Sequence, residues 1–316
     1  MKGLRILVTG GAGFIGSHLT EKLLALGGEV IVLDNYSAAN RGNLDGLASN
    51  RKLRVVEGDI LNANTVGRLV KKADYVFHLA CKVIGLSLVD PKLVHEVNAT
   101  GTLNVCMACR KHRSKRLVYV SSSEVYGTAT YVPMDEDHPF RPTTPYGASK
   151  AAGELYVRSF YYTWNLPAVI VRPFNTYGPR SRTDQYSAVI RRFIDRLLKN
   201  KPPIIYGDGK QTRDFTYVSD VVDGLIKTAE CDELIGDVVN IARGEEVSII
   251  RIAEIVSKLL GKRDEIEPVF QQARPGDVRR HMADISKAKK LLNFRPEVSI
   301  EAGIERLIEW RKTLAG

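Results

Sequence analysis

A glycine-rich segment directly after the first apolar run constrains the fold more than any other feature of the sequence. Residues Arg5–Val8 have the pattern of a short strand, the segment Thr9–Gly16 follows, and a helix-forming run extends over 17–26. Glycines at such a junction allow a tight turn and close backbone approach to a ligand, while the helix N-terminus offers free N–H groups to a phosphate. The sequence therefore predicts a dinucleotide-binding unit with the pyrophosphate at this helix N-terminus.

An acidic residue ends the second predicted strand, Val30–Asp34, and indicates which dinucleotide is bound. The carboxylate of Asp34 can accept hydrogen bonds from both ribose hydroxyls of an adenosine and would repel a 2′-phosphate. NAD is therefore favoured over NADP. Two readings stay open: Asp34 as a simple turn residue before Asn35, and a contribution of the nearby Arg41 to the choice of cofactor.

Strand and helix patterns alternate through the first half of the chain, which predicts an α/β fold with a doubly wound parallel Rossmann sheet. The strands are expected at Arg5–Val8, Val30–Asp34, Leu53–Val56, Tyr75–Leu79, Leu117–Ser121 and Ala168–Arg172, with a later one at Val238–Ala242. Helices are expected at 186–199, 219–230, 248–260, 284–292 and 299–313. We expect a NAD-binding Rossmann domain at 1–175 with a return at about 214–245, and a smaller, discontinuous C-terminal substrate lobe at 176–213 and 246–316.

Composition limits the environment in which the chain works. Of its 316 residues 44% are hydrophobic and 26% charged, and no apolar run approaches the roughly 18 residues of a membrane span. We therefore expect a soluble, cytoplasmic protein without a membrane partner. The net charge of +10 is spread over helical segments without a basic-aromatic motif, so nucleic acid is not expected as a partner.

The four cysteines include one C-x-x-C, Cys106 and Cys109, inside a helical pattern. A zinc site needs two more ligands, and no second pair has suitable spacing. We expect two buried helix thiols and no metal site, with redox or metal chemistry as the alternative.

A tyrosine and a lysine four residues apart, Tyr146 and Lys150, open a later helical stretch and share one helix face. A phenol with an ordinary pKa near 10 is a poor base, but a neighbouring ammonium and a positive nicotinamide both stabilise phenolate. Tyr146 can then exchange a proton with a sugar hydroxyl. Such a pair is common by chance, but here it follows a glycine-loop domain and a strand that ends in Ser121-Ser122-Ser123-Glu124.

With these motifs in place, the chain resembles the nucleotide-sugar epimerase and dehydratase branch of the extended short-chain dehydrogenases/reductases, with UDP-glucose and UDP-uronate 4-epimerases among its members. The resemblance runs over nearly the whole chain and is carried by TGGAGFIG at 9–16, Asp34, GDI at 58–60, HLA at 78–80, N-x-x-GT at 98–102, SSSEVYG at 121–127, YGASK at 146–150, RPFNTYGPR at 172–180 and GDGKQTRDFTYVSD at 207–220.

The resemblance implies a role for each matching residue. The cofactor-binding positions would be Gly10, Gly13, Phe14, Ile15, Gly16, Asp34, Asp59 and Ile60, together with Tyr146 and Lys150. The catalytic positions would be Ser122, Tyr146 and Lys150, with Glu124 as a further candidate. The substrate-binding positions would be Ser122, Ser123, Asn175, Arg182, Arg213 and Arg274. Relatives pair helices equivalent to 92–112 and 146–164, so a homodimer is expected.

The resemblance also implies the reaction: NAD-dependent 4-epimerisation of a nucleotide-sugar, either a UDP-hexose or a UDP-uronate, through a 4-keto intermediate. Glu124 leaves an alternative open, because a serine-glutamate pair resembles UDP-glucuronate decarboxylases and some 4,6-dehydratases. Against a dehydratase, Ser123 replaces the aspartate that would protonate the leaving hydroxyl. In favour of an epimerase, residues 178–190 resemble UDP-hexose and UDP-uronate 4-epimerases, and Arg182 would face a C6 carboxylate. A non-catalytic relative is disfavoured because Tyr146 and Lys150 are both present.

Overall fold

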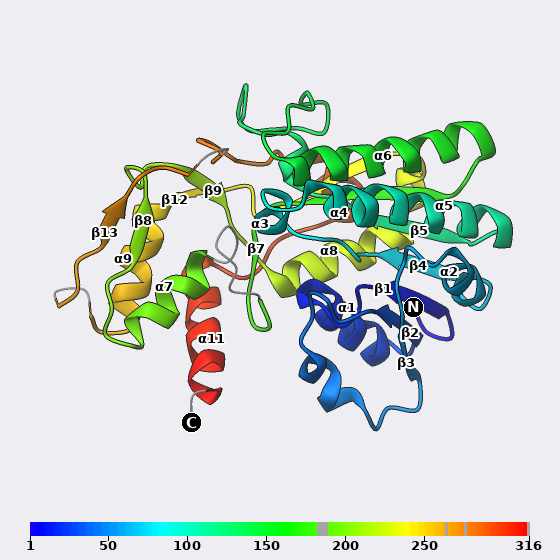
Figure 1. Cartoon of the computed structure of the whole chain (residues 1–316), viewed down its shortest axis with the longest axis horizontal. Helices are drawn as coiled ribbons and strands as arrows, with labels where there is room; N and C mark the ends of the chain where they lie inside the picture. The colour runs from blue at the N-terminus through cyan, green and yellow to red at the C-terminus, as the bar shows by residue number, and fades with distance from the viewer. Residues whose placement is uncertain (182–188, 263–264, 275–276, 315–316) are drawn as a thin grey trace.

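A seven-stranded parallel sheet forms the centre of the chain (Figure 1), with the strand order β11-β6-β5-β4-β1-β2-β3. The computed structural model describes residues 1–181, 189–262, 265–274 and 277–314. The sheet strands are β1 (Arg5–Thr9), β2 (Glu29–Asp34), β3 (Leu53–Glu57), β4 (Tyr75–His78), β5 (Arg116–Val120), β6 (Ala168–Pro173) and β11 (Val238–Ile241). The doubly wound parallel fold expected from the sequence is confirmed.

Helices cover both faces of this sheet because successive strand side chains point to opposite sides. In β1, Ile6 and Val8 pack in one apolar core with α1 and α8, whereas Leu7 packs in a second core with α2, α5 and α6. The covering helices are α1 (Phe14–Ala25), α2 (Ala63–Val70), α3 (Ile84–Ser87), α4 (Pro91–His95), α5 (Gly101–His112), α6 (Pro145–Trp164), α8 (Val218–Glu230) and α10 (Ser286–Leu292). None of the described helices is both long and apolar enough to cross a membrane.

The order of the strands reverses between β1 and β4, and this reversal fixes where a ligand can bind. The chain runs outward from β1 to β2 and β3, then returns to place β4, β5 and β6 on the other side of β1. At such a switch point the connections leave in opposite directions and open a crevice at the carboxyl ends of the strands. The loops after β1, β4, β5 and β6 meet there.

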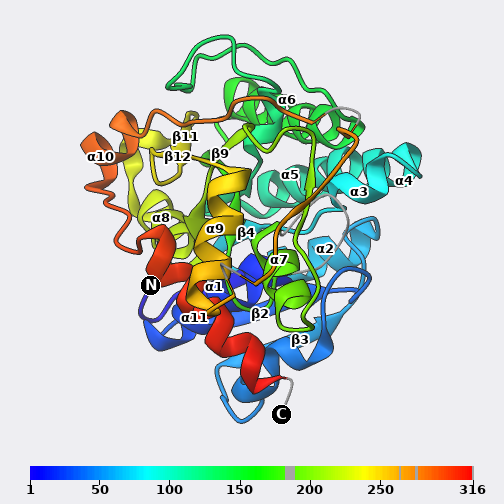
Figure 2. The same cartoon turned by 90° about the vertical axis from the view of Figure 1, so that its left-hand side faces the viewer.

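A smaller lobe lies beside the sheet, to the left in Figure 1 and facing the viewer in Figure 2. It consists of α7 (Val189–Leu197), β8 (Ile204–Tyr206), β9 (Thr212–Asp214), β12 (Glu246–Ser248), α9 (Ile249–Leu259), β13 (Val269–Gln271) and α11 (Ile300–Thr313). β8 pairs with β13, β9 pairs with β12, and the short strands β7 (Thr176–Tyr177) and β10 (Thr216–Tyr217) pair between the lobe and the sheet.

The expected sheet strands agree with the structure to within one residue at each end. The region expected as one helix over 92–112 is interrupted, because α4 passes through a π-helical turn, Glu96–Thr100, before α5 begins. Gly101 follows this turn, and the Ile60 side chain packs where a Cβ atom on Gly101 would lie, at 2.5 Å. The short strand pairs of the smaller lobe were not predicted.

Candidate active site

A cavity of about 420 Å³ lies at the carboxyl ends of the strands and reaches α7, β8 and β9 of the smaller lobe. The predicted site residues that line it are Gly10, Gly13, Phe14, Ile15, Gly16, Asp34, Asp59, Ile60, Ser122, Ser123, Glu124, Tyr146, Asn175, Arg213 and Arg274. Lys150 does not line it and is buried. Arg182 lies outside the described residues.

The glycine loop forms the floor of the cavity under the N-terminus of α1. A side chain at Gly16 would collide with the carbonyl oxygen of Gly10, so this helix can begin close to the loop only with glycine there. Gly13 is the N-cap residue, without a side-chain cap, and no acidic residue lies in the first helical turn. The first backbone N–H groups and the positive end of the helix dipole therefore remain available for a pyrophosphate.

Asp34 ends β2 at the edge of the cavity and also holds the glycine loop. Its carboxylate accepts hydrogen bonds from the backbone N–H of Ala12 at 3.0 Å and of Tyr36 at 2.9 Å. Burial raises the pKa of Asp34, and the backbone donors and the Lys82 ammonium oppose this. Asp34 therefore has both functions that the sequence left open. Its carboxylate fixes the turn of the glycine loop, and the same carboxylate borders the cavity.

Arg41, which left the choice of cofactor open, is engaged away from Asp34. Its guanidinium lies 4.1 Å from the ring centroid of Tyr36 and donates a hydrogen bond of 2.7 Å to Glu57. In the sheet register Glu57 lies opposite Asp34 but on the exposed edge strand β3. Because its guanidinium is already bound to Glu57 and Tyr36, Arg41 is not placed to bind a 2′-phosphate.

Asp59 and Ile60 line the same end of the cavity through the loop after β3. The Asp59 carboxylate accepts from Asn35 Nδ2 at 2.7 Å and from the backbone N–H of Leu61 at 2.8 Å. Asn104 donates to the Ile60 carbonyl at 3.1 Å, which fixes this loop on α5. The loop thus presents an apolar side chain beside a carboxylate, as an adenine site requires.

The phenol of Tyr146 reaches the cavity from the first turn of α6. Thr144 caps this helix by accepting the Gly147 N–H at 3.2 Å, and Pro145 occupies the first helical position. Burial raises the pKa of Tyr146, nearby Cys81 and Glu124 raise it further, and a hydrogen bond with the Ser122 hydroxyl lowers it. Because burial is the largest of these effects, the phenol holds its proton at neutral pH.

Lys150 lies one turn further along α6, behind the cavity wall. Its ammonium donates to the carbonyl of Val120 at 2.7 Å and lies 4.4 Å from the ring centroid of Tyr119. Burial lowers the pKa of Lys150, and Cys81 and Glu154 oppose this. The helix spacing expected from the sequence is present, with the ammonium anchored on the backbone of β5.

Ser122 and Glu124 are held by the short η3 turn (Ser123–Val125) that follows β5. The Ser122 hydroxyl accepts the Glu124 N–H at 3.2 Å. α6 approaches this turn so closely that a Cβ atom on Gly147 would lie 2.5 Å from the Glu124 carbonyl oxygen. Burial raises the pKa of Glu124, Arg213 lowers it and Asp277 raises it. The glycine after Tyr146 thus lets the serine loop and the tyrosine helix meet.

The opposite end of the cavity carries amide and guanidinium donors. Asn175 follows β6, and within the described part of the chain its buried Nδ2 has no hydrogen-bond acceptor. Arg213, on β9, forms an ion pair with Asp277. The Arg274 guanidinium lies 3.7 Å from the ring centroid of Tyr206. An anionic group such as a diphosphate matches this set of donors.

The polar residues of the cavity that sequence reasoning missed include Cys81, Lys82 and Asp277. Cys81 and Lys82 directly follow the HLA motif after β4, so their place at a strand end was the available signal. The Lys82 ammonium donates to Ser37 Oγ at 2.7 Å, beside Asp34. Asp277 lies three residues after Arg274, which was the available signal, but its partner Arg213 is far away in the sequence.

The C-x-x-C thiols lie inside α5, away from this cavity. Cys106 and Cys109 are both fully buried, and burial raises the pKa of the Cys109 thiol to about 12 and that of Cys106 as well. Such thiols are protonated and unreactive at neutral pH. Among the residues that the structure describes, no group of three or more histidine, cysteine or acidic side chains is arranged to hold a metal ion.

Comparison with known proteins places the chain in a family. A family model described as GDP-mannose 4,6 dehydratase matches residues 7–307. A putative UDP-glucose 4-epimerase of Methanocaldococcus jannaschii is 37% identical over 97% of this chain and 98% of that protein. UDP-glucuronic acid decarboxylase 1 of Arabidopsis thaliana is 34% identical over 97% of this chain and 69% of that protein.

A solved structure gives the same result for the fold and the cofactor. The UDP-glucuronic acid 4-epimerase of Bacillus cereus, in complex with UDP-glucuronic acid and NAD, is 34% identical, covers 98% of this chain and 100% of its own, and superposes with a TM-score of 0.92. The glycine loop and Asp34 fit the same cofactor. The chain therefore belongs to the NAD-dependent nucleotide-sugar epimerase and dehydratase family of extended short-chain dehydrogenases/reductases.

Proposed function

We propose that the protein is an NAD-dependent 4-epimerase of a UDP-linked hexose or uronate. One observation carries the proposal: the cavity joins the Tyr146 phenol and the Ser122 hydroxyl to a dinucleotide loop at one end and to anion-binding donors at the other. A proton carrier between a redox cofactor and a diphosphate anchor suits reversible oxidation of a sugar hydroxyl. Relatives named as 4-epimerases support the same activity.

Tyr146 removes the proton of the C4 hydroxyl and later returns it, while Ser122 hydrogen-bonds the reacting oxygen. Bound NAD would accept the C4 hydrogen together with its bonding electron pair and would later return both to C4. Its positive nicotinamide ring would also favour the phenolate of Tyr146, whose pKa burial otherwise raises. Lys150 is proposed to hold the cofactor ribose, which its ammonium can reach only by leaving the Val120 carbonyl behind the cavity wall.

The diphosphate is held by Asn175, Arg213 and Arg274 while the sugar ring rotates in the cavity. Anchoring by the diphosphate alone leaves the hexose free to present either face of C4 to the nicotinamide. Arg182 is proposed to face a C6 carboxylate where the substrate is a uronate. Ser123 contacts the sugar beside Ser122.

Decarboxylation or 4,6-dehydration is the second candidate, and Glu124 is the specific observation that favours it. Its carboxyl group borders the cavity, and burial raises its pKa, as a C5 base or acid requires. Against 4,6-dehydration, the hydroxyl of Ser123 is too weak an acid to protonate a leaving hydroxyl, and against decarboxylation, residues 178–190 resemble those of 4-epimerases. We therefore assign Glu124 to the organisation of the loop beside Arg213.

The product of the reaction separates the two candidates. We expect UDP-glucose, UDP-N-acetylglucosamine or UDP-glucuronate to give an isobaric C4 epimer without deuterium at C5 when the reaction runs in D₂O. Glu124→Gln should keep substantial activity, because only the loop is disturbed. Mass spectrometry and NMR of the product measure both. A product from UDP-glucuronate lighter by carbon dioxide, with no epimer from any of the three, would refute the epimerase and leave the cofactor assignment intact.

We also propose a homodimer through the surface of α5 and α6. Large apolar side chains are exposed there: Met107 on α5 is 56% exposed, and Leu155 and Tyr162 on α6 are 59% and 71% exposed. Leu155 and Tyr162 are seven positions apart and share one helix face. Burial of this face by a second copy would remove its apolar surface from water.

For the assembly we expect a dimer mass in sedimentation experiments, and Leu155→Arg should shift it to the monomer. Val269→Arg is the matched control, because Val269 is a 43% exposed apolar residue of β13 in the smaller lobe. It should leave the dimer unchanged. A wild-type monomer mass at all concentrations would contradict the proposal.

Two further sequence predictions stay proposals. We assign residues 1–175 and 214–245 to NAD binding and residues 176–213 and 246–316 to substrate binding; the pairing of β11 beside β6 supports this division, whereas α10 packs on β11 and α8 of the sheet domain. A cytoplasmic location stays a prediction from the sequence.

A further inference from the structure

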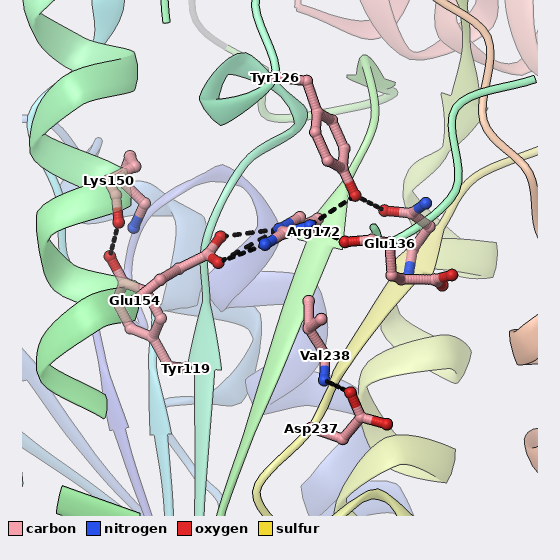
Figure 3. Close-up of polar contacts among 9 residues, drawn as sticks. Tyr119, Tyr126, Glu136, Lys150, Glu154, Arg172, Asp237 and Val238 are labelled. Atoms are coloured by element: carbon pink, nitrogen blue, oxygen red, sulfur yellow. Dashed lines mark hydrogen bonds and ion pairs between the residues drawn. The ribbon is translucent and has the colours of Figure 1, made fainter. Parts of the chain in front are cut away.

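A buried ion pair joins helix α6 to strand β6 of the sheet (Figure 3), and neither of its residues lines the cavity. Arg172, on β6, and Glu154, on α6, are 1% and 0% exposed. Arg172 Nη2 donates to Glu154 Oε2 at 2.7 Å, and Arg172 Nε donates to Oε1 at 3.0 Å. This two-pronged geometry fixes both the distance and the direction between β6 and α6.

The third nitrogen of the same guanidinium points to a different element. Arg172 Nη1 donates to the Tyr126 hydroxyl at 2.7 Å, and this hydroxyl donates in turn to Asn240 Oδ1 at 2.7 Å. Arg172 Nη1 also donates to the Glu136 carbonyl at 3.0 Å. Each polar hydrogen on this side has an acceptor, so the phenol of Tyr126 is held in one orientation (Figure 3).

Arg172 contacts α6 and the residue that follows the η3 turn. These two elements carry Tyr146 and Ser122, the proposed proton-transfer pair. Tyr126 directly follows the η3 turn that Ser122 caps, and its backbone N–H donates to the Ser123 carbonyl at 3.1 Å. Glu154 continues the face of α6 on which Tyr146 and Lys150 lie, at spacings of four residues. A single side chain therefore connects the Ser122 turn with the Tyr146 helix.

Stability alone does not account for this arrangement. Removing two charges from water costs about as much as their attraction returns, so an apolar pair would stabilise the fold equally well. What the ion pair adds is a fixed geometry that an apolar contact does not impose. None of Arg172, Glu154 and Tyr126 lines the cavity, so none has been given a part in binding or catalysis.

We propose that Arg172 is a positioning residue that sets the separation between the Ser122 hydroxyl and the Tyr146 phenol. It acts through Tyr126 on the serine turn and through Glu154 on α6. The proposal rests on the proton-transfer role of Tyr146 within the proposed function, but it does not depend on which sugar is bound. When the contacts of Arg172 are weakened, the Ser122 hydroxyl and the Tyr146 phenol move apart.

The experiment titrates the Tyr146 phenol directly. Near-ultraviolet phenolate absorbance is recorded against pH for the NAD-bound protein, and the curve of the same protein carrying Tyr146→Phe is subtracted. Besides Ser122, the groups that face this phenol are Cys81 and Glu124 from two loops, and Lys150 lies one turn along α6. All of them are the same in each variant compared, so a difference reports the hydrogen bond.

Three variants give the comparison. Tyr126→Phe removes one oxygen and keeps the ion pair, and Arg172→Lys keeps the charge but loses the forked geometry. Arg116→Lys is the control: Arg116 is also buried in the sheet, but at the start of β5, where it pairs with Asp232. If Arg172→Lys does not fold, Tyr126→Phe alone decides.

Tyr126→Phe and Arg172→Lys should raise the apparent pKa of Tyr146 by about 0.5 to 1 pH unit, the size expected for one weakened hydrogen bond. They should lower kcat about tenfold with unchanged affinity for NAD. Arg116→Lys should lower the melting temperature but leave the apparent pKa of Tyr146 and kcat unchanged. A wild-type Tyr146 titration in Tyr126→Phe would overturn the proposal. If no nucleotide-sugar is turned over, the proposed function has failed and the titration still tests the positioning role.

Discussion

Tyr146→Phe is expected to remove nearly all turnover while the protein keeps its fold. The change deletes one phenolic oxygen at a half-buried position of α6, and the polar partner of this oxygen is the Ser122 hydroxyl. Because a positioned acid or base contributes roughly 10² to 10⁴ in rate, kcat should fall by about 10³-fold or more. Ser122→Ala should cost less, about 10²-fold, since it removes only the partner of the proton carrier.

The measurement is the steady-state rate of product formation, with circular dichroism and NAD titration to verify folding. Tyr75→Phe is the matched control, because Tyr75 begins β4 at the opposite end of the sheet from the cavity. It should keep the wild-type kcat. If the Tyr146→Phe protein turned over substrate at the wild-type rate, the proton would be carried by another group and the proposed mechanism would be wrong.

The sequence predicted the sheet well because its strands are long enough to show their pattern. Each buried strand of four to six residues alternates with a helix, and this alternation is itself the signature of a parallel sheet. The strand pairs of the smaller lobe, such as β8 with β13 and β9 with β12, have three residues each. A run of three residues is too short to show the alternation of buried and exposed side chains that marks a strand. These strand pairs are therefore visible only in the folded structure.

The site was predictable where a motif carries the chemistry and unpredictable where two distant segments meet. Ser122, Tyr146 and Asp34 lie in motifs with a fixed place relative to a strand or helix. The pairing of Arg213 with Asp277 and the contact of Arg172 with Tyr126 join residues that are 64 and 46 positions apart in the sequence. Such contacts depend on the order of the strands in the sheet and on the course of the loops between them. A short stretch of sequence contains neither.

The choice of cofactor should change most strongly at Asp34. We expect the wild-type protein to bind NAD more tightly than NADP, because a 2′-phosphate would place negative charge beside a buried carboxylate. Asp34→Asn keeps the shape of the side chain and one acceptor but removes the charge. Since a hydrogen bond to a charged group contributes about 1.5 to 3 kcal/mol, affinity for NAD should fall by about 10- to 100-fold.

Part of that loss would come from the protein itself, because Asp34 also accepts the backbone N–H groups of Ala12 and Tyr36. Affinity for NADP separates the two contributions. Loosening of the glycine loop weakens both cofactors equally, whereas removal of the charge weakens NAD and relieves the repulsion of NADP. In Asp34→Asn the affinity for NADP, divided by the affinity for NAD, should therefore rise. This rise should exceed the loss of NAD affinity alone.

Glu57→Gln is the matched control for this titration, because Glu57 is the register partner of Asp34 on the neighbouring strand but does not line the cavity. It removes the same charge one strand away and replaces the charge-assisted hydrogen bond of Arg41 by a weaker neutral one. Both affinities should stay at their wild-type values. Tighter binding of NADP than of NAD by the wild-type protein would reject the role given to Asp34, and a changed ratio in Glu57→Gln would assign the selectivity to Arg41 instead.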